Sequence, residues 1–223
     1  MTVLPVVEKF VSIDGEGHRA GALACFIRLA GCNLRCSYCD TDYALSTCSG
    51  VYTDIKSLVQ FVADARCKHV TITGGEPLIH SGLLELVRAL VMAGVEVNIE
   101  TNGSLPFSQL QLEGVTITCD YKLPSSGMHE RNNLAAIRAL RTCDVLKFVA
   151  ARCDFADIRR ALLELRPGCQ VFISPVFGKC RPVEIVSLMQ DLRTDPEFDD
   201  LIDRMRLQVQ LHKIVWDPDA RGV

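Results

Sequence analysis

Three cysteines, Cys32, Cys36 and Cys39, constrain this chain more than any other feature of its sequence. Their CxxxCxxC spacing places three thiolates on one short loop, and each iron of a 4Fe-4S cluster takes a ligand from outside the cluster. Three thiolates would hold three irons and leave the fourth iron open to bind a further molecule. The alternative is a zinc site, which needs four ligands, so Cys25 or Cys48 would have to complete it. The spacing favours the iron–sulfur cluster and leaves zinc open.

The length and composition of the chain favour one globular domain over residues 1–223. A chain of this size can bury a large core, and its charged fraction of 23% is ordinary for a globular protein. The net charge of −3 argues against direct binding of nucleic acid, whose phosphates call for a basic surface. No apolar run is long enough to span a membrane, and the segment MTVLPVVEKF does not resemble a secretory signal. We therefore expect neither a nucleic-acid nor a membrane partner.

The chain carries eleven cysteines, and this odd number without a visible signal peptide predicts a reduced, cytoplasmic protein. Outside the CxxxCxxC loop, no two cysteines form a second cluster motif. We expect most of these others to be small buried hydrophobic residues. They are Cys25, Cys48, Cys67, Cys119, Cys143, Cys153, Cys169 and Cys180.

Short apolar runs alternate with segments of helical periodicity along most of the chain. The expected strands are 23–29, 69–73, 95–100, 115–119, 145–149, 170–174 and 207–212. The expected helices are one capped by Thr53 and ending near 66, one capped by Ser81 and closed by Gly94, and three over 131–141, 154–166 and 182–193. Residues 6–21 are expected to form a glycine-rich segment of turns. This order predicts an α/β fold with parallel strands and crossover helices, as an incomplete β/α TIM-like barrel.

Polar and glycine-rich motifs follow directly after several of the expected strands. The cysteine loop follows 23–29, GGEP at 74–77 follows 69–73, and TNG at 101–103 follows 95–100. In a β/α barrel the carboxyl ends of the strands form one face, and active sites lie on that face. We therefore expect these separate loops to converge on the cysteine loop.

The CxxxCxxC motif with Tyr38 before its last cysteine, together with GGEP at 74–77, resembles the radical S-adenosylmethionine (SAM) superfamily. A closer resemblance, over nearly the whole chain, is to the 7-carboxy-7-deazaguanine synthase family. The segments that carry it are FVSIDGEG at 10–17, FIRLAGCNLRCSYCDT at 26–41, TITGGEP at 71–77, IETNGS at 99–104, DYKLPSSGM at 120–128, SPVFG at 174–178, and QLHKIVWDP with the final RGV.

This resemblance implies a radical SAM carbon–nitrogen lyase with a 4Fe-4S cluster, SAM and Mg²⁺ as cofactors. The implied reaction is the ring contraction of 6-carboxy-5,6,7,8-tetrahydropterin to 7-carboxy-7-deazaguanine with loss of ammonia, within 7-deazapurine (queuosine) biosynthesis. The family also implies a homodimer and an electron donor of the flavodoxin or ferredoxin type.

The resemblance carries residue roles over to matching positions of this chain, with no catalytic side chain assigned beyond the cluster and SAM. Metal ligands would be Cys32, Cys36 and Cys39 for the cluster and Thr41 for Mg²⁺. SAM contacts would be Gly75, Glu76, Thr101, Asn102, Asp120, Tyr121 and Lys122. Substrate contacts would be Ile13, Asp14, Gly15, Glu16, Arg28, Thr73 and the terminal Val223. The chain departs from many members at Asp14, where they have Gln, and at 120–122, where they have Ser-Pro-Lys.

Several alternatives stay open on the residues alone. Arg28 could pair with a neighbouring carboxylate or with a substrate carboxylate, which suits its forked donors. Glu76 could be held by nearby backbone or could meet the SAM ammonium. His212 and Lys213 could approach the substrate or be structural. Other functions to weigh are a radical SAM activase of a glycyl-radical enzyme, although no inserted cysteine motif is evident, and a non-enzymatic metal-binding module.

Overall fold

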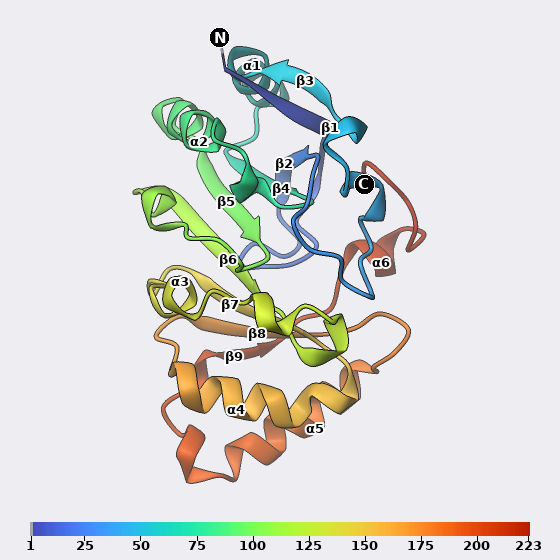
Figure 1. Cartoon of the computed structure of the whole chain (residues 1–223), viewed down its shortest axis with the longest axis vertical. Coiled ribbons are helices and arrows are strands. Elements are labelled where there is room, and N and C mark those ends of the chain that lie inside the picture. Colours follow the sequence, from blue (N-terminus) through green and yellow to red (C-terminus); the bar gives the residue numbers. More distant parts are fainter. Residues whose placement is uncertain (1) are drawn as a thin grey trace.

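The computed structural model describes residues 2–223, and these form nine strands in one sheet of order β3-β1-β2-β4-β5-β6-β7-β8-β9 (Figure 1). From β2 through β9 each neighbouring pair is parallel, whereas β1 pairs antiparallel with both β2 and β3. The end strands β3 and β9 are not hydrogen-bonded to each other, so the barrel stays open. The strands are β1 Val3–Ile13, β2 Leu23–Leu29, β3 Val51–Asp54, β4 His69–Gly74, β5 Glu96–Thr101, β6 Val115–Tyr121, β7 Val145–Ala150, β8 Gln170–Pro175 and β9 Met205–Leu207.

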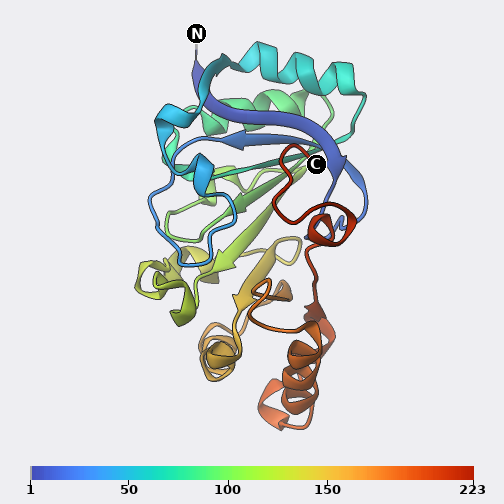
Figure 2. The same cartoon turned by 90° about the vertical axis from the view of Figure 1, so that its right-hand side faces the viewer.

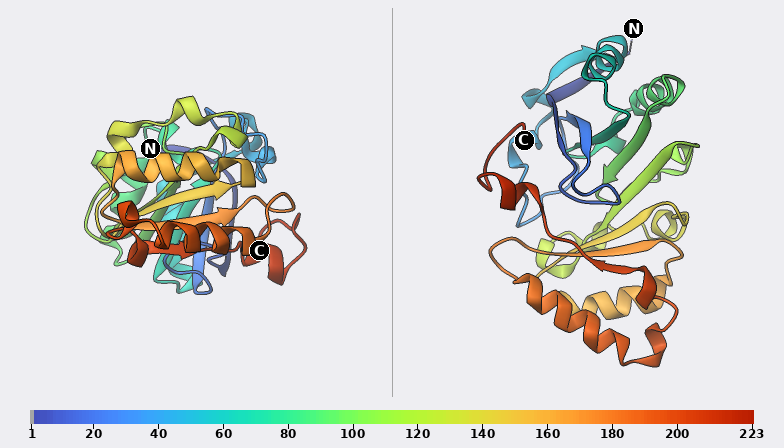
Figure 3. Two further views of the ribbon diagram at one scale, coloured as in Figure 1. Left: turned by 90° about the horizontal axis from the view of Figure 1, so that it is seen from below. Right: turned by 180° about the vertical axis from the view of Figure 1, so that it is seen from behind.

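Helices between the strands cover the outer face of the curved sheet (Figures 1 and 3). Their apolar faces join one continuous core that runs from Leu4 on β1 to Met205 on β9. Burial of such amphipathic faces is what stabilises helices of this length, because they are marginal alone. The helices are α1 Ile55–Ala65, α2 Leu83–Met92, α3 Leu134–Arg138, α4 Phe155–Leu165, α5 Pro182–Arg193 and α6 His212–Val215.

The two faces of the parallel strands differ in chemistry, and this difference shapes the site. Val97 and Ile99 of β5 belong to the apolar core, whereas Asn98 between them accepts a hydrogen bond of 2.9 Å from the Thr118 hydroxyl of β6. Successive side chains of a strand point to opposite faces, so the alternation places polar groups on the face without helices. The inside of the open barrel is therefore buried but polar.

The central strands and α5 agree with the sequence-based expectation, and the incomplete barrel is confirmed. The expectation was wrong at the two ends of the chain. Residues 6–21 were expected to be turns, but β1 extends to Ile13 because its alternating apolar residues pair with both β2 and β3. A strand was expected over 207–212, but β9 ends at Leu207 and α6 begins at His212.

Smaller differences concern the helix ends. The carboxylate of Asp54, rather than Thr53, caps α1 by accepting a hydrogen bond from the backbone N–H of Ser57. Gly82 rather than Ser81 precedes α2, and the helix expected over 131–141 is reduced to α3. Among residues 2–223, no helix is both long and apolar enough to cross a membrane.

Candidate active site

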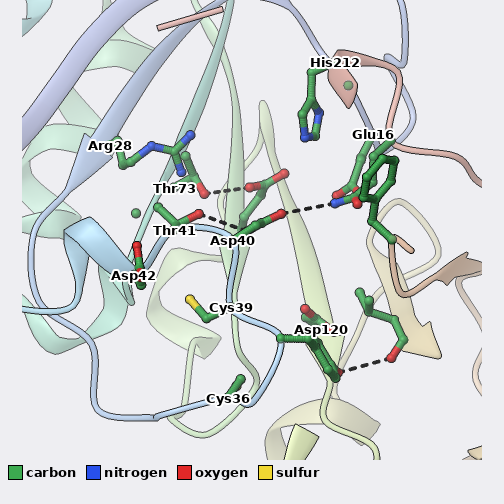
Figure 4. Close-up of a pocket in the computed structure, with 18 of the residues that line it drawn as sticks. Glu16, Arg28, Cys36, Cys39, Asp40, Thr41, Asp42, Thr73, Asp120 and His212 are labelled. Carbon is green, nitrogen blue, oxygen red and sulfur yellow. Dashed lines mark hydrogen bonds between the residues drawn. The ribbon is translucent and has the colours of Figure 1, made fainter. Parts of the chain in front are cut away.

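A cavity of about 690 Å³ lies where the parallel strands end, on the polar face of the sheet (Figure 4). Its wall combines residues of β1 and β7, the loops after β1, β2, β4, β5, β6 and β8, and the last residues of the chain. This volume is typical of a pocket that encloses a small molecule or cofactor. The convergence expected from the sequence is therefore present.

The cysteine loop forms one wall of this cavity, with Cys32, Cys36 and Cys39 all lining it. The loop is anchored at its centre by Ser37, whose backbone N–H donates to the carbonyl of Ser126 at 3.0 Å and whose hydroxyl donates to the carbonyl of Ser125 at 2.7 Å.

The arrangement of sulfur atoms fits an iron–sulfur cluster better than zinc. Cys25 is buried in the core and Cys48 is exposed, and neither lines the cavity, so neither supplies the fourth zinc ligand. Within residues 2–223, no three His, Cys, Asp or Glu side chains stand close enough to hold a single metal ion. A cluster does not require such convergence, because each thiolate binds a different iron.

The Gly74-Gly75 turn is hydrogen-bonded directly onto the cysteine loop. The backbone N–H of Gly75 donates to the carbonyl of Leu29 at 3.0 Å, and that of Glu76 donates to the carbonyl of Gly31 at 2.8 Å. A Cβ at Gly75 would lie 2.2 Å from the Gly31 oxygen, and Gly74 has a φ of +145°. Only glycine permits this approach.

The carboxylate of Glu76 joins this turn to the next one. Glu76 is fully buried and does not line the cavity. It accepts hydrogen bonds from the backbone N–H groups of Leu78 at 3.0 Å and Asn102 at 2.7 Å and from the Thr101 hydroxyl at 2.9 Å. Burial raises the pKa of Glu76, and the two backbone donors act against that rise. Of the two alternatives for Glu76, the structure therefore supports the backbone brace.

Asn102, held by that brace, reaches toward the first cysteine. Its amide donates to the Asn33 side chain at 2.9 Å and lies 3.9 Å from the Cys32 sulfur. Thr101 and Asn102 both line the cavity, as expected for this turn. The turns after β4 and β5 thus face the same wall as the cysteine loop.

Arg28, at the end of β2, pairs with a carboxylate of the chain itself. Its Nε donates to Glu8 of β1 at 2.6 Å, and the Tyr43 hydroxyl donates to the same Glu8 oxygen at 2.8 Å. All three residues line the cavity, and Figure 4 shows the guanidinium beside Thr73. Glu8 orients Arg28 through Nε alone, which leaves the two terminal nitrogens of the fork for a ligand.

A second group of charges surrounds the ion pair between Lys147 of β7 and Glu16. Both side chains are nine-tenths buried, and one oxygen of Glu16, Oε1, has no hydrogen-bond partner within residues 2–223. Glu100 accepts a hydrogen bond of 2.6 Å from the Thr73 hydroxyl nearby. Burial raises the pKa of Glu100, and Lys147 partly offsets this.

Asp120, near the end of β6, and Lys122, directly after it, form a third pair with a nitrogen–oxygen distance of 2.7 Å. Burial by itself would lower the pKa of Lys122, but Asp120 and other neighbouring anions outweigh it, so the pKa is raised and the lysine stays charged. The second oxygen of Asp120, Oδ1, is buried without a partner in the described part of the chain. An orphaned carboxylate oxygen in a cavity wall is suited to accept from a ligand.

Asp40 and Thr41 lie at the far end of the cysteine loop, next to Asp42 (Figure 4). The Thr41 hydroxyl donates to Asp40 at 3.0 Å, and the Lys213 ammonium donates to the other Asp40 oxygen at 2.8 Å. All of these residues line the cavity. The oxygens here have the chemistry that a hard cation prefers.

The last residues of the chain fold back over the cavity mouth (Figure 2). The backbone N–H of Leu211 donates to the carbonyl of Gly15 at 3.1 Å, and a Cβ at Gly15 would lie 2.3 Å from the His212 ring. The Arg221 guanidinium stacks 3.9 Å from the centre of the Tyr43 ring, and Val223 lines the cavity. Burial lowers the pKa of His212, which favours its neutral form.

Most of the residues singled out from the sequence line this one cavity. They are Ile13, Gly15, Glu16, Arg28, Cys32, Cys36, Cys39, Thr41, Thr73, Gly75, Thr101, Asn102, Asp120, Lys122 and Val223.

Asp14, Glu76 and Tyr121 lie outside the cavity wall. Asp14 points into the barrel, accepts a hydrogen bond of 2.9 Å from the Thr71 hydroxyl, and has a pKa raised by burial to about 7. The Tyr121 ring lies 5.3 Å from that of Phe148, which belongs to the core.

Sequence reasoning missed many residues of the wall, among them Glu8, Tyr43, Glu100 and Lys147, whose polar groups face or support the cavity. Glu8 was hidden because β1 was not recognised. Lys147 did carry a signal, since a lone lysine within the apolar run VLKFVA must find a buried partner.

Comparison with known proteins shows which family this chain resembles in sequence and in fold. The Radical SAM superfamily model matches residues 26–121. A 7-carboxy-7-deazaguanine synthase of Clostridium acetobutylicum is 40% identical, over 98% of this chain and 98% of the relative. One of Chlorobaculum tepidum is 36% identical, over 99% and 97%. The crystal structure of QueE from Escherichia coli has a TM-score of 0.67 at 23% identity, covers 93% of this chain and 94% of that one, and supports the fold.

Replacement of Glu76 by Gln tests the buried brace. The amide group would turn a donor toward the Asn102 N–H and leave both unsatisfied, so the free energy of unfolding should fall by about 1–3 kcal/mol. Urea unfolding of the purified protein measures this. Glu85→Gln, on the exposed side of α2, is the matched control and should change stability by less than about 0.5 kcal/mol. If both variants changed the free energy of unfolding equally, Glu76 would not stabilise the contact between the two turns.

Proposed function

The chain belongs to the 7-carboxy-7-deazaguanine synthases, and from this premise we propose how its cavity divides between cofactors and substrate. As a member of that family it is a radical SAM enzyme that uses a 4Fe-4S cluster and SAM. The relatives matched over 86–98% of their own length are synthases, which favours neither the glycyl-radical activase nor the non-enzymatic module. The observation that carries the proposal is the convergence of fifteen expected residues on one cavity.

We place the cluster at Cys32, Cys36 and Cys39 and SAM beside it, against Gly75 and Asn102. Gly75 lines the cavity, and its missing side chain lets its backbone pack against Gly31 and beside Cys32. Bound together, the cluster and SAM supply the one-electron chemistry that removes a hydrogen atom from the substrate.

The Asp120–Lys122 pair suits the amino acid end of SAM. The orphaned Asp120 Oδ1 can accept from an ammonium or hydroxyl group, while the ammonium of Lys122 attracts a carboxylate. Because the pair is already formed, the chain holds both charges in place before a ligand arrives, which lowers the ordering cost of binding.

We place the pterin against Arg28, Thr73, Glu16 and Glu100. The unpartnered Glu16 Oε1 and the Glu100 carboxylate can accept from the N–H edge of the ring. The terminal nitrogens of Arg28 face the same space and fit the substrate carboxylate as a fork. The reaction proposed here is the conversion of 6-carboxy-5,6,7,8-tetrahydropterin to 7-carboxy-7-deazaguanine with loss of ammonia.

The side chains of the cavity orient the substrate and limit access of water. Residues of the C-terminal segment cover the mouth, and we propose that Val223, which lines the wall, contacts the substrate. Exclusion of water strengthens every charge interaction inside and protects reactive species from side reactions. No side chain beyond the metal ligands is assigned a direct catalytic step.

We propose Thr41 as the protein ligand of Mg²⁺, with substrate oxygens and waters completing its shell. Mg²⁺ takes oxygen ligands and keeps several waters, so one hydroxyl from the protein is sufficient. Asp40 and Asp42 on either side of Thr41 add negative charge to this part of the wall.

We also propose the wider setting of the enzyme. One continuous core supports a single domain over residues 1–223. The eleven free cysteines support a reducing, cytoplasmic location. A homodimer, an electron donor of the flavodoxin or ferredoxin type, and a role of the product in queuosine biosynthesis are carried from the family.

The cluster assignment is tested by reconstituting the protein with iron and sulfide under anaerobic conditions and adding SAM, a reductant and 6-carboxytetrahydropterin. Mass spectrometry should detect 7-carboxy-7-deazaguanine with the unchanged chain. Cys36→Ala should lose iron, visible absorbance and product, because one iron loses its ligand. The matched control Cys48→Ala, at an exposed cysteine outside the cavity, should keep all three. Full iron binding by Cys36→Ala would refute the assignment.

Arg28→Ala tests the substrate carboxylate. Loss of a charge-assisted contact worth about 1.5–3 kcal/mol should weaken carboxypterin binding by about 10- to 150-fold. Isothermal titration should show unchanged SAM affinity. A tetrahydropterin without the carboxylate should bind the original and altered proteins equally. If the variant also bound that analogue more weakly, Arg28 would not be the residue that recognises the carboxylate.

Thr41→Ala tests the metal ligand. Turnover with Mg²⁺ should fall toward the rate measured without Mg²⁺, because the hydroxyl oxygen is lost. Thr41→Ser retains that oxygen and should keep the response to added Mg²⁺. The rate is measured against Mg²⁺ concentration. The same Mg²⁺ dependence in Thr41→Ala and the original chain would limit Thr41 to a structural role.

A further inference from the structure

The loop 14–22 between β1 and β2 crosses the open barrel and contacts residues at the far end of the sheet. The His18 ring lies 5.5 Å from the Phe172 ring of β8, edge to face. Gly17 is hydrogen-bonded to Gln208, the first residue after β9. Because β3 and β9 do not pair, this loop joins the two sides of the barrel without a strand ladder.

Gln208 holds Gly17 by both of its backbone polar groups. The Gly17 N–H donates to Gln208 Oε1 at 2.8 Å, and Gln208 Nε2 donates to the Gly17 carbonyl at 3.1 Å. The backbone N–H of Gln208 in turn donates to the Ile173 carbonyl of β8 at 3.0 Å. Gln208 is only 8% exposed, and hydrogen bonds shielded from water in this way are stronger. We refer to the Gln208 side chain and the Gly17 backbone as the amide clamp.

The amide clamp lies next to Glu16, which its own neighbours cannot hold in place. Gly15 and Gly17 flank it, and glycine has more backbone freedom than any other residue. The segment after β9 restrains both glycines, because the amide clamp holds Gly17 and the Leu211 N–H donates to the Gly15 carbonyl at 3.1 Å. The backbone of Glu16 is thus fixed on both sides from the other end of the chain.

The Glu16 side chain faces the space for a ligand. It lines the cavity, its carboxylate pairs with Lys147, and its Oε1 is buried without a partner in the described part of the chain. An acceptor binds best when it is already in place, since ordering a mobile group on binding lowers the affinity. Lys147 restrains the carboxylate end of this side chain, and the amide clamp restrains its backbone.

We propose that Gln208 is a positioning residue for the substrate, which through the amide clamp fixes the Glu16 carboxylate against the N–H edge of the pterin. This inference rests on the proposed function, which places the pterin against Glu16. Gln208 does not line the cavity, so it acts through Glu16 and not by contact with the ligand. An amide is suited to this task because it offers an acceptor and a donor side by side, as the Gly17 backbone requires.

Amide hydrogen exchange of the cluster-loaded protein tests the amide clamp itself. Gln208→Met removes both hydrogen bonds at similar side-chain length, so peptides covering 14–22 should exchange about tenfold faster or more. The matched control is Gln111→Met, at a glutamine outside the cavity that donates to the Ala139 carbonyl at 2.8 Å. The control should leave exchange in 14–22 unchanged. Equal exchange in Gln208→Met and the unaltered protein would overturn the inference.

Calorimetric titration with carboxypterin then tests the positioning role. Gln208→Met should bind carboxypterin about tenfold more weakly or worse, with the SAM affinity and iron content of the unaltered protein. Glu16→Gln keeps an oxygen for Lys147 and turns its NH₂ group toward the pterin, so the acceptor is lost. In that background Gln208→Met should change carboxypterin binding less than twofold. An undiminished effect there would show that Gln208 does not act through Glu16 and would overturn the inference.

Gln208→Glu is the second variant, used if Gln208→Met loses its iron or its SAM affinity. Its carboxylate accepts from the Gly17 N–H but cannot donate to the carbonyl, so exchange should still rise and carboxypterin binding should still fall. Unchanged carboxypterin binding in the variant, beside an active unaltered protein, would refute the role of Gln208 alone. An unaltered protein that forms no 7-carboxy-7-deazaguanine would refute the proposed function instead, and the exchange result would still report on the amide clamp.

Discussion

The site depends on the contact between the turn after β4 and the cysteine loop. Gly75 lies so close to Gly31 that a single added carbon would collide with the carbonyl, and two backbone hydrogen bonds hold the segments together. The buried Glu76 carboxylate then extends this contact to the turn after β5 through Thr101 and Asn102. Three loops that enter from different strands are thereby fixed relative to one another. A cluster whose ligands all lie on one loop needs such support, because loops alone are mobile.

Charge compensation is the second constraint on the cavity. Each buried cation of the wall has a carboxylate partner from the chain, as in the pairs Arg28–Glu8, Lys147–Glu16 and Lys122–Asp120. Isolated charges in such a place would cost several kcal/mol each or would lose their charge. The pairs keep the cavity polar and organised, while the orphaned oxygens of Glu16 and Asp120 remain for ligands. The wall is thus suited to a small, highly polar substrate and to a charged cofactor.

The C-terminal segment packs against the glycine-rich loop that follows β1. Gln208 exchanges two hydrogen bonds with the backbone of Gly17, and His212 occupies the space that the missing side chain of Gly15 leaves. Because of this contact, the glycine-rich motif near the start of the chain and the last residues together form one wall of the cavity. The same segment places the Lys213 ammonium 5.2 Å from the centre of the Phe177 ring, and both residues line the cavity.

The amino-acid sequence by itself determined the cysteine loop, the central parallel strands, and the turns that carry glycine and polar residues, because spacing and periodicity are local properties of the chain. Tertiary structure alone decided which of these residues reach the cavity. From the sequence, Glu76 and Asp14 were as strongly predicted to reach the cavity as Gly75 and Thr73. The side chains of Glu76 and Asp14 nevertheless point into the interior of the protein and do not line the cavity. Glu8 and Lys147 became part of the wall only because the register of β1 and β7 brought them opposite Arg28 and Glu16. Contacts of this kind join residues far apart in the chain, so no local pattern reveals them.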